Sequence, residues 1–131
     1  MLDGFSPIPV FTGSAFLSVT DNGINFNKNV LLRMNKPEYV VLLLNREKKQ
    51  LAIQECCKEN TNSVQFYKPS TDIKYGVRFN NRDIENTIAA MMNWNLKESN
   101  YRIDGVYLEN EHAMLFDLNR FRQFAKKNLK K

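Results

Sequence analysis

The chain has 131 residues, of which 43% are hydrophobic and 25% charged, with a formal net charge of +5. This balance is typical of a globular domain that folds without disulfides or metal, and it argues against global disorder. The longest apolar run, Val40–Leu44, is too short to span a bilayer, so we expect no membrane association. The adjacent cysteines, Cys56 and Cys57, are typical of a reducing compartment, and we expect a cytoplasmic protein.

The first half of the chain predicts two strands, a helix and a hairpin, in that order. Gly23 follows Asp21 and Asn22 in a sequence that favours a tight hairpin turn. Asn27 is a good helix N-cap, because its side-chain oxygen can accept from an unpaired backbone N–H. The run at Tyr39–Leu44 is continuously apolar, which predicts a strand buried on both faces. The expected elements are strands at 15–20, 24–26, 39–44 and 50–57 and a helix at 28–35.

The second half repeats this order around a similar phrase. Gly23–Phe26 reads GINF and precedes Asn27, while Gly76–Phe79 reads GVRF and precedes Asn80. Each phrase leads into a helical pattern and then a hairpin pattern, which indicates an internal duplication or a pseudo-twofold pair. The units would cover about 14–57 and 63–118. The second unit is expected to contain strands at 63–68, 76–79, 101–108 and 113–118 and a helix at 81–93 capped by Asn80.

Positive charge is concentrated at the C-terminal end. Residues 118–131 hold six of the 19 basic residues and no acidic residue, whereas the remainder holds 13 basic and 14 acidic residues. Leu118, Phe121, Phe124 and Leu129 predict a basic helix over 118–131. This helix could clamp nucleic acid, lie on a membrane surface or dock on an acidic partner. Alternatively, its two phenylalanines pack on the core and its lysines only add solubility.

The expected fold is therefore mixed α+β, a single compact domain over 1–131. Two similar β-β-α-β-β units would form a barrel-like β-rich core, followed by the basic C-terminal helix. In its first unit, the run Asn22–Asn27 and the hairpin Tyr39–Ile53 resemble the swapped-hairpin domain of AbrB-type transcription regulators, including the tandem-unit MraZ type. This resemblance implies an interlocked barrel whose basic loops and strands contact DNA.

The candidate nucleic-acid-binding residues are basic residues near the repeated phrase and in the tail, since Lys and Arg neutralise phosphates. The alternative is that they are ordinary solvated charges interleaved with acidic residues such as Asp83 and Glu85. The candidates are Lys28, Arg33, Arg78, Arg82, Arg120, Arg122, Lys126 and Lys127.

Enzymatic chemistry is not indicated. His112 is the single histidine, which leaves little basis for a histidine-based metal cluster or a catalytic dyad. Cys56 and Cys57 do not have zinc-ligand spacing, and the sequence contains no Gly-rich phosphate loop. We therefore expect no catalytic residue, no metal and no cofactor.

Two functions are compatible with these patterns. The first is a non-enzymatic DNA-binding regulatory or architectural protein, which acts as a monomer or a homodimer. The second is a protein–protein interaction module, such as an accessory or inhibitor protein of mobile-element type, with a basic tail. The DNA interpretation gains if Lys28, Arg78, Arg82 and the tail share one face, and the protein-partner interpretation gains if they scatter.

Overall fold

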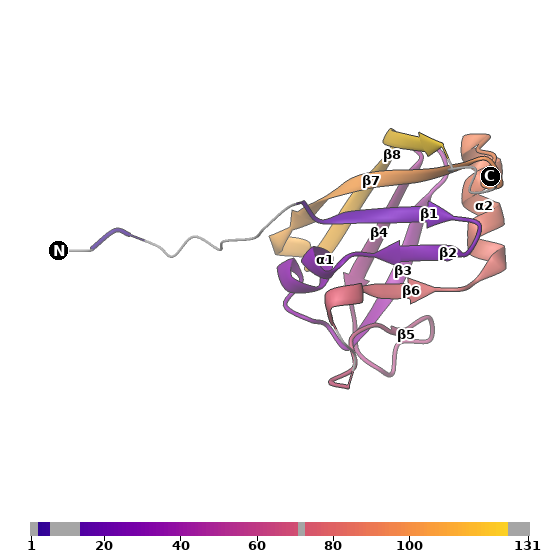
Figure 1. The fold of residues 1–131 in the computed structure, drawn as a ribbon. Helices are drawn as coiled ribbons and strands as arrows, with labels where there is room; N and C mark the ends of the chain where they lie inside the picture. The colour runs from indigo at the N-terminus through magenta and orange to yellow at the C-terminus, as the bar shows by residue number, and fades with distance from the viewer. Residues whose placement is uncertain (1–2, 6–13, 71–72, 126–131) are drawn as a thin grey trace.

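The computed structural model describes residues 3–5, 14–70 and 73–125. Within these ranges one antiparallel sheet, in the order β5-β3-β4-β8-β7-β1-β2-β6, curls into a half-barrel with two helices at opposite ends (Figure 1). This confirms the mixed α+β class and the barrel-like core. The strands are β1 (Phe16–Thr20), β2 (Gly23–Phe26), β3 (Tyr39–Asn45), β4 (Gln50–Glu55), β5 (Val64–Gln65), β6 (Val77–Phe79), β7 (Ser99–Leu108) and β8 (Ala113–Ala125). The helices are α1 (Lys28–Arg33) and α2 (Arg82–Met92), with 3-10 turns η1 (Ile73–Tyr75) and η2 (Glu109–Glu111).

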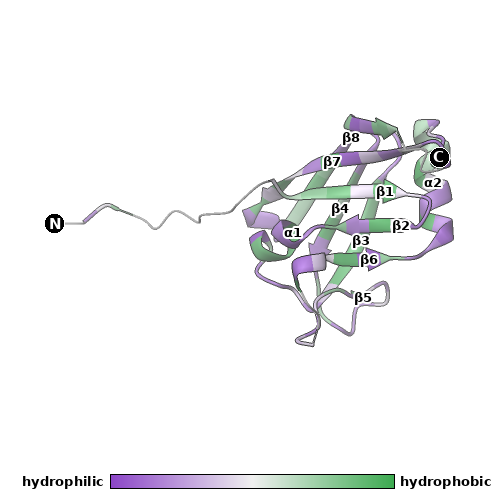
Figure 2. Cartoon of the chain, in the orientation of Figure 1, coloured by the Kyte–Doolittle hydropathy of each residue, from purple (hydrophilic) through white to green (hydrophobic). Residues whose placement is uncertain are grey.

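The core fills the inside of the curl. Strand alternation turns every second residue inward, and these residues are almost all apolar. Along β1 and β2 in Figure 2, green hydrophobic positions are interrupted by white or purple ones. Twelve large side chains are completely or almost completely buried, which is the main source of stability for a domain of this size. They are Leu17, Val19, Ile24, Phe26, Val30, Leu31, Ile53, Ile88, Ile103, Met114, Phe116 and Leu118.

Aromatic side chains connect the two ends of the sheet. Phe66, immediately after β5, stacks on Phe79 of β6 with ring centroids 6.1 Å apart. Phe26 of β2 meets both rings edge-on, at 5.6 and 5.9 Å. Among the residues that the structure describes, β5 and β6 form no backbone ladder. The curl is therefore closed by side-chain packing rather than by hydrogen bonds.

The two repeated glycines lie against each other's strand-to-helix joints. Gly23 has φ +141°, and a Cβ there would lie 2.7 Å from the backbone oxygen of Phe79. Gly76 has φ +71°, and a Cβ there would overlap the backbone oxygen of Phe26. L-residues other than glycine rarely adopt such φ values. Glycine is required at both positions by the backbone conformation and by the close approach of β2 and β6.

The other predicted strands and the two internal helices are found with small boundary changes, the strand at 63–68 is reduced to Val64–Gln65, and the first cap is confirmed. Asn27 Oδ1 accepts from the backbone N–H of Val30 at 3.3 Å. The second cap was predicted one residue early. Asn81, not Asn80, accepts from the N–H groups of Asp83 and Ile84, at 2.9 and 3.1 Å, because the chain stays extended for one residue longer after β6.

The prediction that the strand at 39–44 is buried on both faces is wrong. Of β3, only Val40 is fully buried, and Leu43 is 43% exposed. The reason is that β5 has two residues and pairs only with Tyr39 and Val40. Among the described residues, the remainder of β3 has no strand partner on this side.

The predicted C-terminal helix is also wrong where the structure describes it. Residues 118–125 continue β8, and residues 121–125 pair with β7 after a register shift between Ile103 and Gly105. Phe121 packs edge-on against Trp94 and Tyr101, at 5.1 and 5.5 Å. The free edge of β7 and this aromatic contact together outweigh the helical spacing of the apolar residues. Residues 126–131 of the predicted helix lie outside the described residues.

The close approach of β2 and β6 predicts that Gly76→Ala is strongly destabilising. The methyl group would meet backbone atoms, and the positive φ would be strained, so we expect a loss of roughly 2–4 kcal/mol in the free energy of unfolding. Chemical denaturation measures this loss.

Gly4→Ala is the matched control. Gly4 also has a positive φ, +85°, but no heavy atom lies within 4 Å of a Cβ built there. Its substitution should change stability by about 0.5 kcal/mol or less. Equal effects of the two substitutions would contradict the packing argument.

Candidate nucleic-acid interface

Lys28 on α1, Arg78 on β6 and Arg82 on α2 do not gather on one face, which by the criterion above favours the protein-partner interpretation.

A row of polar residues nevertheless crosses five strands on the outer face of the sheet. Antiparallel register places Arg78 of β6 opposite Asn25 of β2, Asn25 opposite Ser18 of β1, Ser18 opposite Arg102 of β7, and Arg102 opposite Arg122 of β8. We call Arg78, Asn25, Ser18, Arg102 and Arg122 the outer row. Their inward-facing neighbours belong to the core, so alternation forces these side chains outward. Arg78 therefore lies at one end of the row and Arg102 and Arg122 at the other, with Asn25 and Ser18 between them.

The middle of the outer row is hollowed into a pocket of about 270 Å³. Arg78 and Arg102 both line it, and no acidic residue does. Within the described part of the chain, neither arginine forms an ion pair or a side-chain hydrogen bond. Two uncompensated positive charges in one hollow produce a positive potential that attracts anions. The lining residues are Ser18, Thr20, Asn25, Arg78, Asn100, Tyr101, Arg102 and Phe124.

Arg102 is held between two aromatic rings. Its guanidinium carbon lies 4.2 Å from the ring centroid of Phe16 and 5.0 Å from that of Phe124. Such cation–π contacts fix the guanidinium plane and leave its N–H edge open for a ligand. The site thus contains a pre-oriented arginine beside a ring that is 42% exposed, Phe124.

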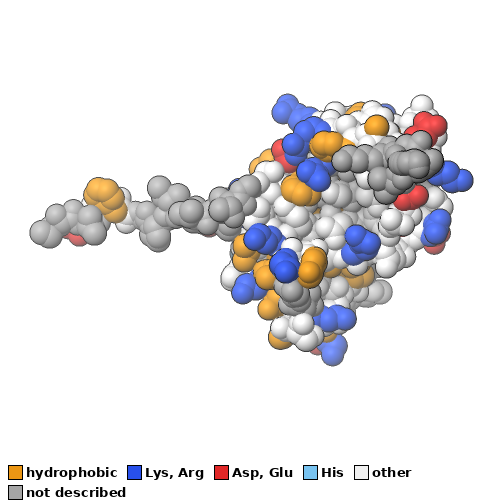
Figure 3. Space-filling model, in the orientation of Figure 1, with side chains coloured by type: hydrophobic (Ala, Val, Ile, Leu, Met, Phe, Trp, Pro, Cys, Tyr) orange, Lys and Arg blue, Asp and Glu red, His pale blue; other side chains and the backbone are white. Residues whose placement is uncertain are grey.

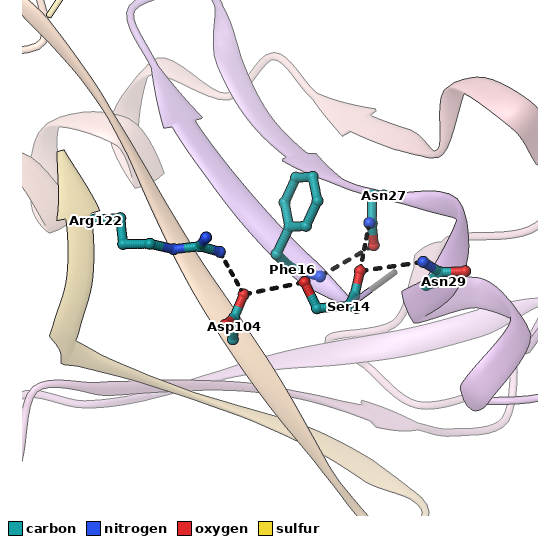
Figure 4. Close-up of polar contacts among 6 residues, drawn as sticks. All are labelled: Ser14, Phe16, Asn27, Asn29, Asp104 and Arg122. Atoms are coloured by element: carbon teal, nitrogen blue, oxygen red, sulfur yellow. Dashed lines mark hydrogen bonds and ion pairs between the residues drawn. The ribbon is translucent and has the colours of Figure 1, made fainter. Parts of the chain in front are cut away.

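The first repeated phrase holds Phe16 in place. Asn27 Oδ1 accepts from the N–H of Phe16 at 3.0 Å, and Asn27 Nδ2 donates to the carbonyl of Ser14 at 2.9 Å (Figure 4). Asn29 Nδ2 donates to the same carbonyl at 3.1 Å. The residue that caps α1 therefore also anchors the start of β1 and, through Phe16, supports Arg102.

Arg122, at the other end of the outer row, is partly neutralised. Its Nη2 lies 2.7 Å from Oδ1 of Asp104, which also accepts from Ser14 Oγ at 3.4 Å (Figure 4). Both charged side chains are about half exposed, so the pair contributes little to stability. It reduces the positive potential at this end of the row relative to the pocket.

The predicted site residues are only partly brought together. Arg78 and Arg122 lie in the outer row, whereas Arg82 starts α2 and lines a separate hollow with Asp21 and Glu85. Arg120 is exposed and lies 3.8 Å from a carboxylate oxygen of Asp117.

Helix α1 carries two further candidates. Lys28, the first residue of α1, is exposed, and Arg33, the last residue of α1, is half-buried. Lys126 and Lys127 lie outside the described residues.

The sequence analysis missed Arg102 and did not connect Phe124 with it. The alternation in Tyr101–Leu108 already points Arg102 outward, and this signal could have identified it as a surface cation. Its position beside Arg78 depends on β1 and β2 lying between β7 and β6, which no local pattern shows.

Other chemically capable groups lie away from the outer row. Cys56 is half-buried and Cys57 exposed, and both are free thiols. Burial is the main cause that raises the pKa of the Cys56 thiol, and the nearby Cys57 and Glu55 raise it further. His112 sits exposed in the turn before β8.

No metal centre or membrane span is found in the described ranges. They contain no cluster of three or more His, Cys, Asp or Glu side chains able to hold a metal ion. None of the helices in these ranges has the length and apolarity needed to cross a membrane.

Comparisons with protein-family models, curated proteins and solved structures find no match to this chain. The resemblance to AbrB-type regulators therefore stays a prediction.

The raised pKa of Cys56 predicts slow alkylation at neutral pH. In a Cys57→Ser variant, which leaves the burial effect in place, the iodoacetamide reaction rate should rise with a midpoint above the ordinary thiol value of about 8.5. Mass spectrometry across a pH series measures the rate, with a short cysteine peptide as reference. A midpoint at or below that of the peptide would contradict the assignment.

Proposed function

We propose that the protein is a non-enzymatic, regulatory or architectural nucleic-acid-binding protein, with DNA as the expected ligand. The observation that carries this proposal is that Arg78 and Arg102 line one pocket whose described lining contains no acidic residue. Arginine matches phosphate geometry through its planar fork of donors, and it retains its charge at any physiological pH.

The distribution of charge around the pocket supports phosphate binding. Figure 3 views the side of β1, β2, β6 and β7, and Lys and Arg side chains are spread over this face with fewer acidic ones among them. Adjacent strands lie about 4.8 Å apart, so the Cα atoms of Arg78 and Arg102, three strands apart, are separated by roughly 14 Å. Both long side chains can reach into the hollow between them, where a chain of phosphates would contact both.

The pairing pattern also supports an internal duplication. When β1–β4 are exchanged with β5–β8, the pairs β2–β6 and β4–β8 map onto themselves, and β3–β5 maps onto β7–β1. Asn25 and Arg78, which occupy equivalent places in GINF and GVRF, are direct register partners. Gly23 and Gly76 make reciprocal contacts. A pseudo-twofold pair of units, as the AbrB resemblance implies, accounts for all three observations.

The proposal predicts salt-dependent binding that requires the two pocket arginines. Fluorescence anisotropy with labelled DNA over a salt series should give a linear fall of log K with log salt. Arg78→Ala/Arg102→Ala should weaken binding and reduce the magnitude of the slope by about 1.4–1.8, since each phosphate contact contributes about 0.7–0.9.

Arg46→Ala/Arg82→Ala is the matched control, because it removes the same charge from residues that line other hollows. It should change the slope by well under half as much. Equal effects of the two double variants would indicate a net-charge effect, and no binding by the unmodified protein at low salt would refute the function.

The alternative function, a protein–protein interaction module, is favoured by one observation. Beyond the short β5, β3 has no strand partner on that side among the described residues, and a groove of about 320 Å³ between β3 and α2 contains Leu43, which is 43% exposed. Open edges pair readily with another strand. A second copy of the chain is the simplest occupant, since two β3 edges can pair antiparallel about a twofold axis.

This alternative predicts a dimer that a charged edge disrupts. Sedimentation equilibrium of the full chain should show a dimer, and Leu43→Lys should shift it toward monomer by about tenfold or more in the dissociation constant. Val106→Lys is the control, since Val106 is 59% exposed on β7, where it pairs with Leu115 of β8, and it does not line the groove beside β3. A monomer at all concentrations would exclude this occupant.

A further inference from the structure

Four polar side chains that line the pocket have no partner within the described residues. Ser18, Asn25, Arg78 and Asn100 form no side-chain hydrogen bond there. Thr20 differs, because its hydroxyl is used in the β1–β2 turn, where it donates to the carbonyl of Gly23 at 3.3 Å and accepts from the N–H of Asn22 at 3.0 Å. Polar groups gathered in one hollow without partners are typical of a site that a ligand completes.

One of these groups is a buried acceptor. Oδ1 of Asn100 has less than 1 Å² of exposed area and no hydrogen-bond partner among the described residues. A buried acceptor without a partner is unfavourable, and a donor on a ligand would satisfy it. Phosphate oxygens cannot donate, so a phosphate alone leaves this atom unsatisfied. Base amino groups and sugar hydroxyls can donate.

The exposed ring of Phe124 at the edge of the pocket is a second feature that the ligand should match. Asn100 is the register partner of Phe124, so the unsatisfied acceptor and the ring lie on neighbouring strands. One face of Phe124 covers the guanidinium of Arg102, and the side chain is 42% exposed. Nucleic-acid bases stack on such rings when they are free of a partner strand. In a duplex the base faces are covered by their neighbours and the phosphates lie outside.

We infer that the pocket holds one nucleotide of a single-stranded nucleic acid. Its phosphate lies between Arg78 and Arg102, its base stacks on Phe124, and the Asn100 amide turns so that its buried Oδ1 accepts from a base or sugar donor. This inference rests on the proposed nucleic-acid-binding function and refines it, since it selects unpaired strands over duplexes. A duplex can use the arginines but not the ring or the buried acceptor.

The test compares a labelled single-stranded DNA, the RNA of the same sequence and the matching DNA duplex by fluorescence anisotropy with the full chain. A single strand should bind about tenfold or more tightly than the duplex. Phe124→Ala should weaken single-strand binding by about 5- to 100-fold, as expected for the loss of one base stack, and should weaken duplex binding by a clearly smaller factor, since a duplex loses only the support of Arg102. Phe124→Tyr should retain binding because it keeps the ring.

Tyr75→Ala is the matched control. Tyr75 is 70% exposed and, like Phe124, lies against a cation, with Nζ of Lys74 at 5.1 Å from its ring centroid, but it does not line the pocket. It should change single-strand affinity by less than about twofold. An equal effect of Tyr75→Ala and Phe124→Ala would overturn the assignment of the base to Phe124.

The other outcomes separate the inference from the function on which it rests. Duplex binding as tight as single-strand binding, with Phe124→Ala neutral, would overturn the inference and leave the nucleic-acid function intact. If inorganic phosphate competes as effectively as the unlabelled oligonucleotide, compared per phosphate, the pocket is a general anion site and the inference is overturned. No binding of any of the three probes at low salt would refute both.

Discussion

The close contact between β2 and β6 is the constraint on which the rest of the molecule depends. Strand β2 begins at Gly23, and β6 begins directly after Gly76. Both glycines have positive φ, and each lies against backbone atoms at the end of the other strand. A side chain at Gly23 or Gly76 would separate the strands by the width of a methyl group. The curl would then open at the place where Phe26, Phe66 and Phe79 close it, and the enclosed apolar core would become accessible to water.

The same contact builds the candidate site. With β6 held against β2, Arg78 enters a row that continues across β1 to Arg102. The other end of the row depends on β8, whose register shift allows its last residues to follow β7 and bring Phe124 over the guanidinium of Arg102. Segments far apart in the chain thus converge on one hollow. Asn27 links this surface to the fold, because it caps α1 and holds Phe16 in place.

The surface chemistry differs between the two proposed contacts. The outer row is basic, with free donors and an exposed ring, which suits an anionic ligand with flat bases. The open edge of β3 is apolar and offers backbone groups, which suits another strand. Because these surfaces lie on different strands, both contacts are compatible with one molecule.

Local patterns determined much of this protein. Alternation identified the strands, Asn27 and its neighbours predicted the first helix, and the repeated phrase marked the two glycines whose contact closes the curl. Two of the predicted site residues, Arg78 and Arg122, lie in the same row of the outer face, and their role in binding stays a prediction. These features depend on neighbours within a few residues, which is the range over which sequence periodicity acts.

Only the tertiary structure decided the rest. Residues 118–125 form a strand because β7 offers a free edge and Trp94 a packing surface, although their spacing also fits a helix. The strand β3 is exposed because β5 is short. Arg102 meets Arg78 because β1 and β2 lie between their strands. Each outcome depends on which distant segment lies alongside, and a one-dimensional pattern carries no record of that choice.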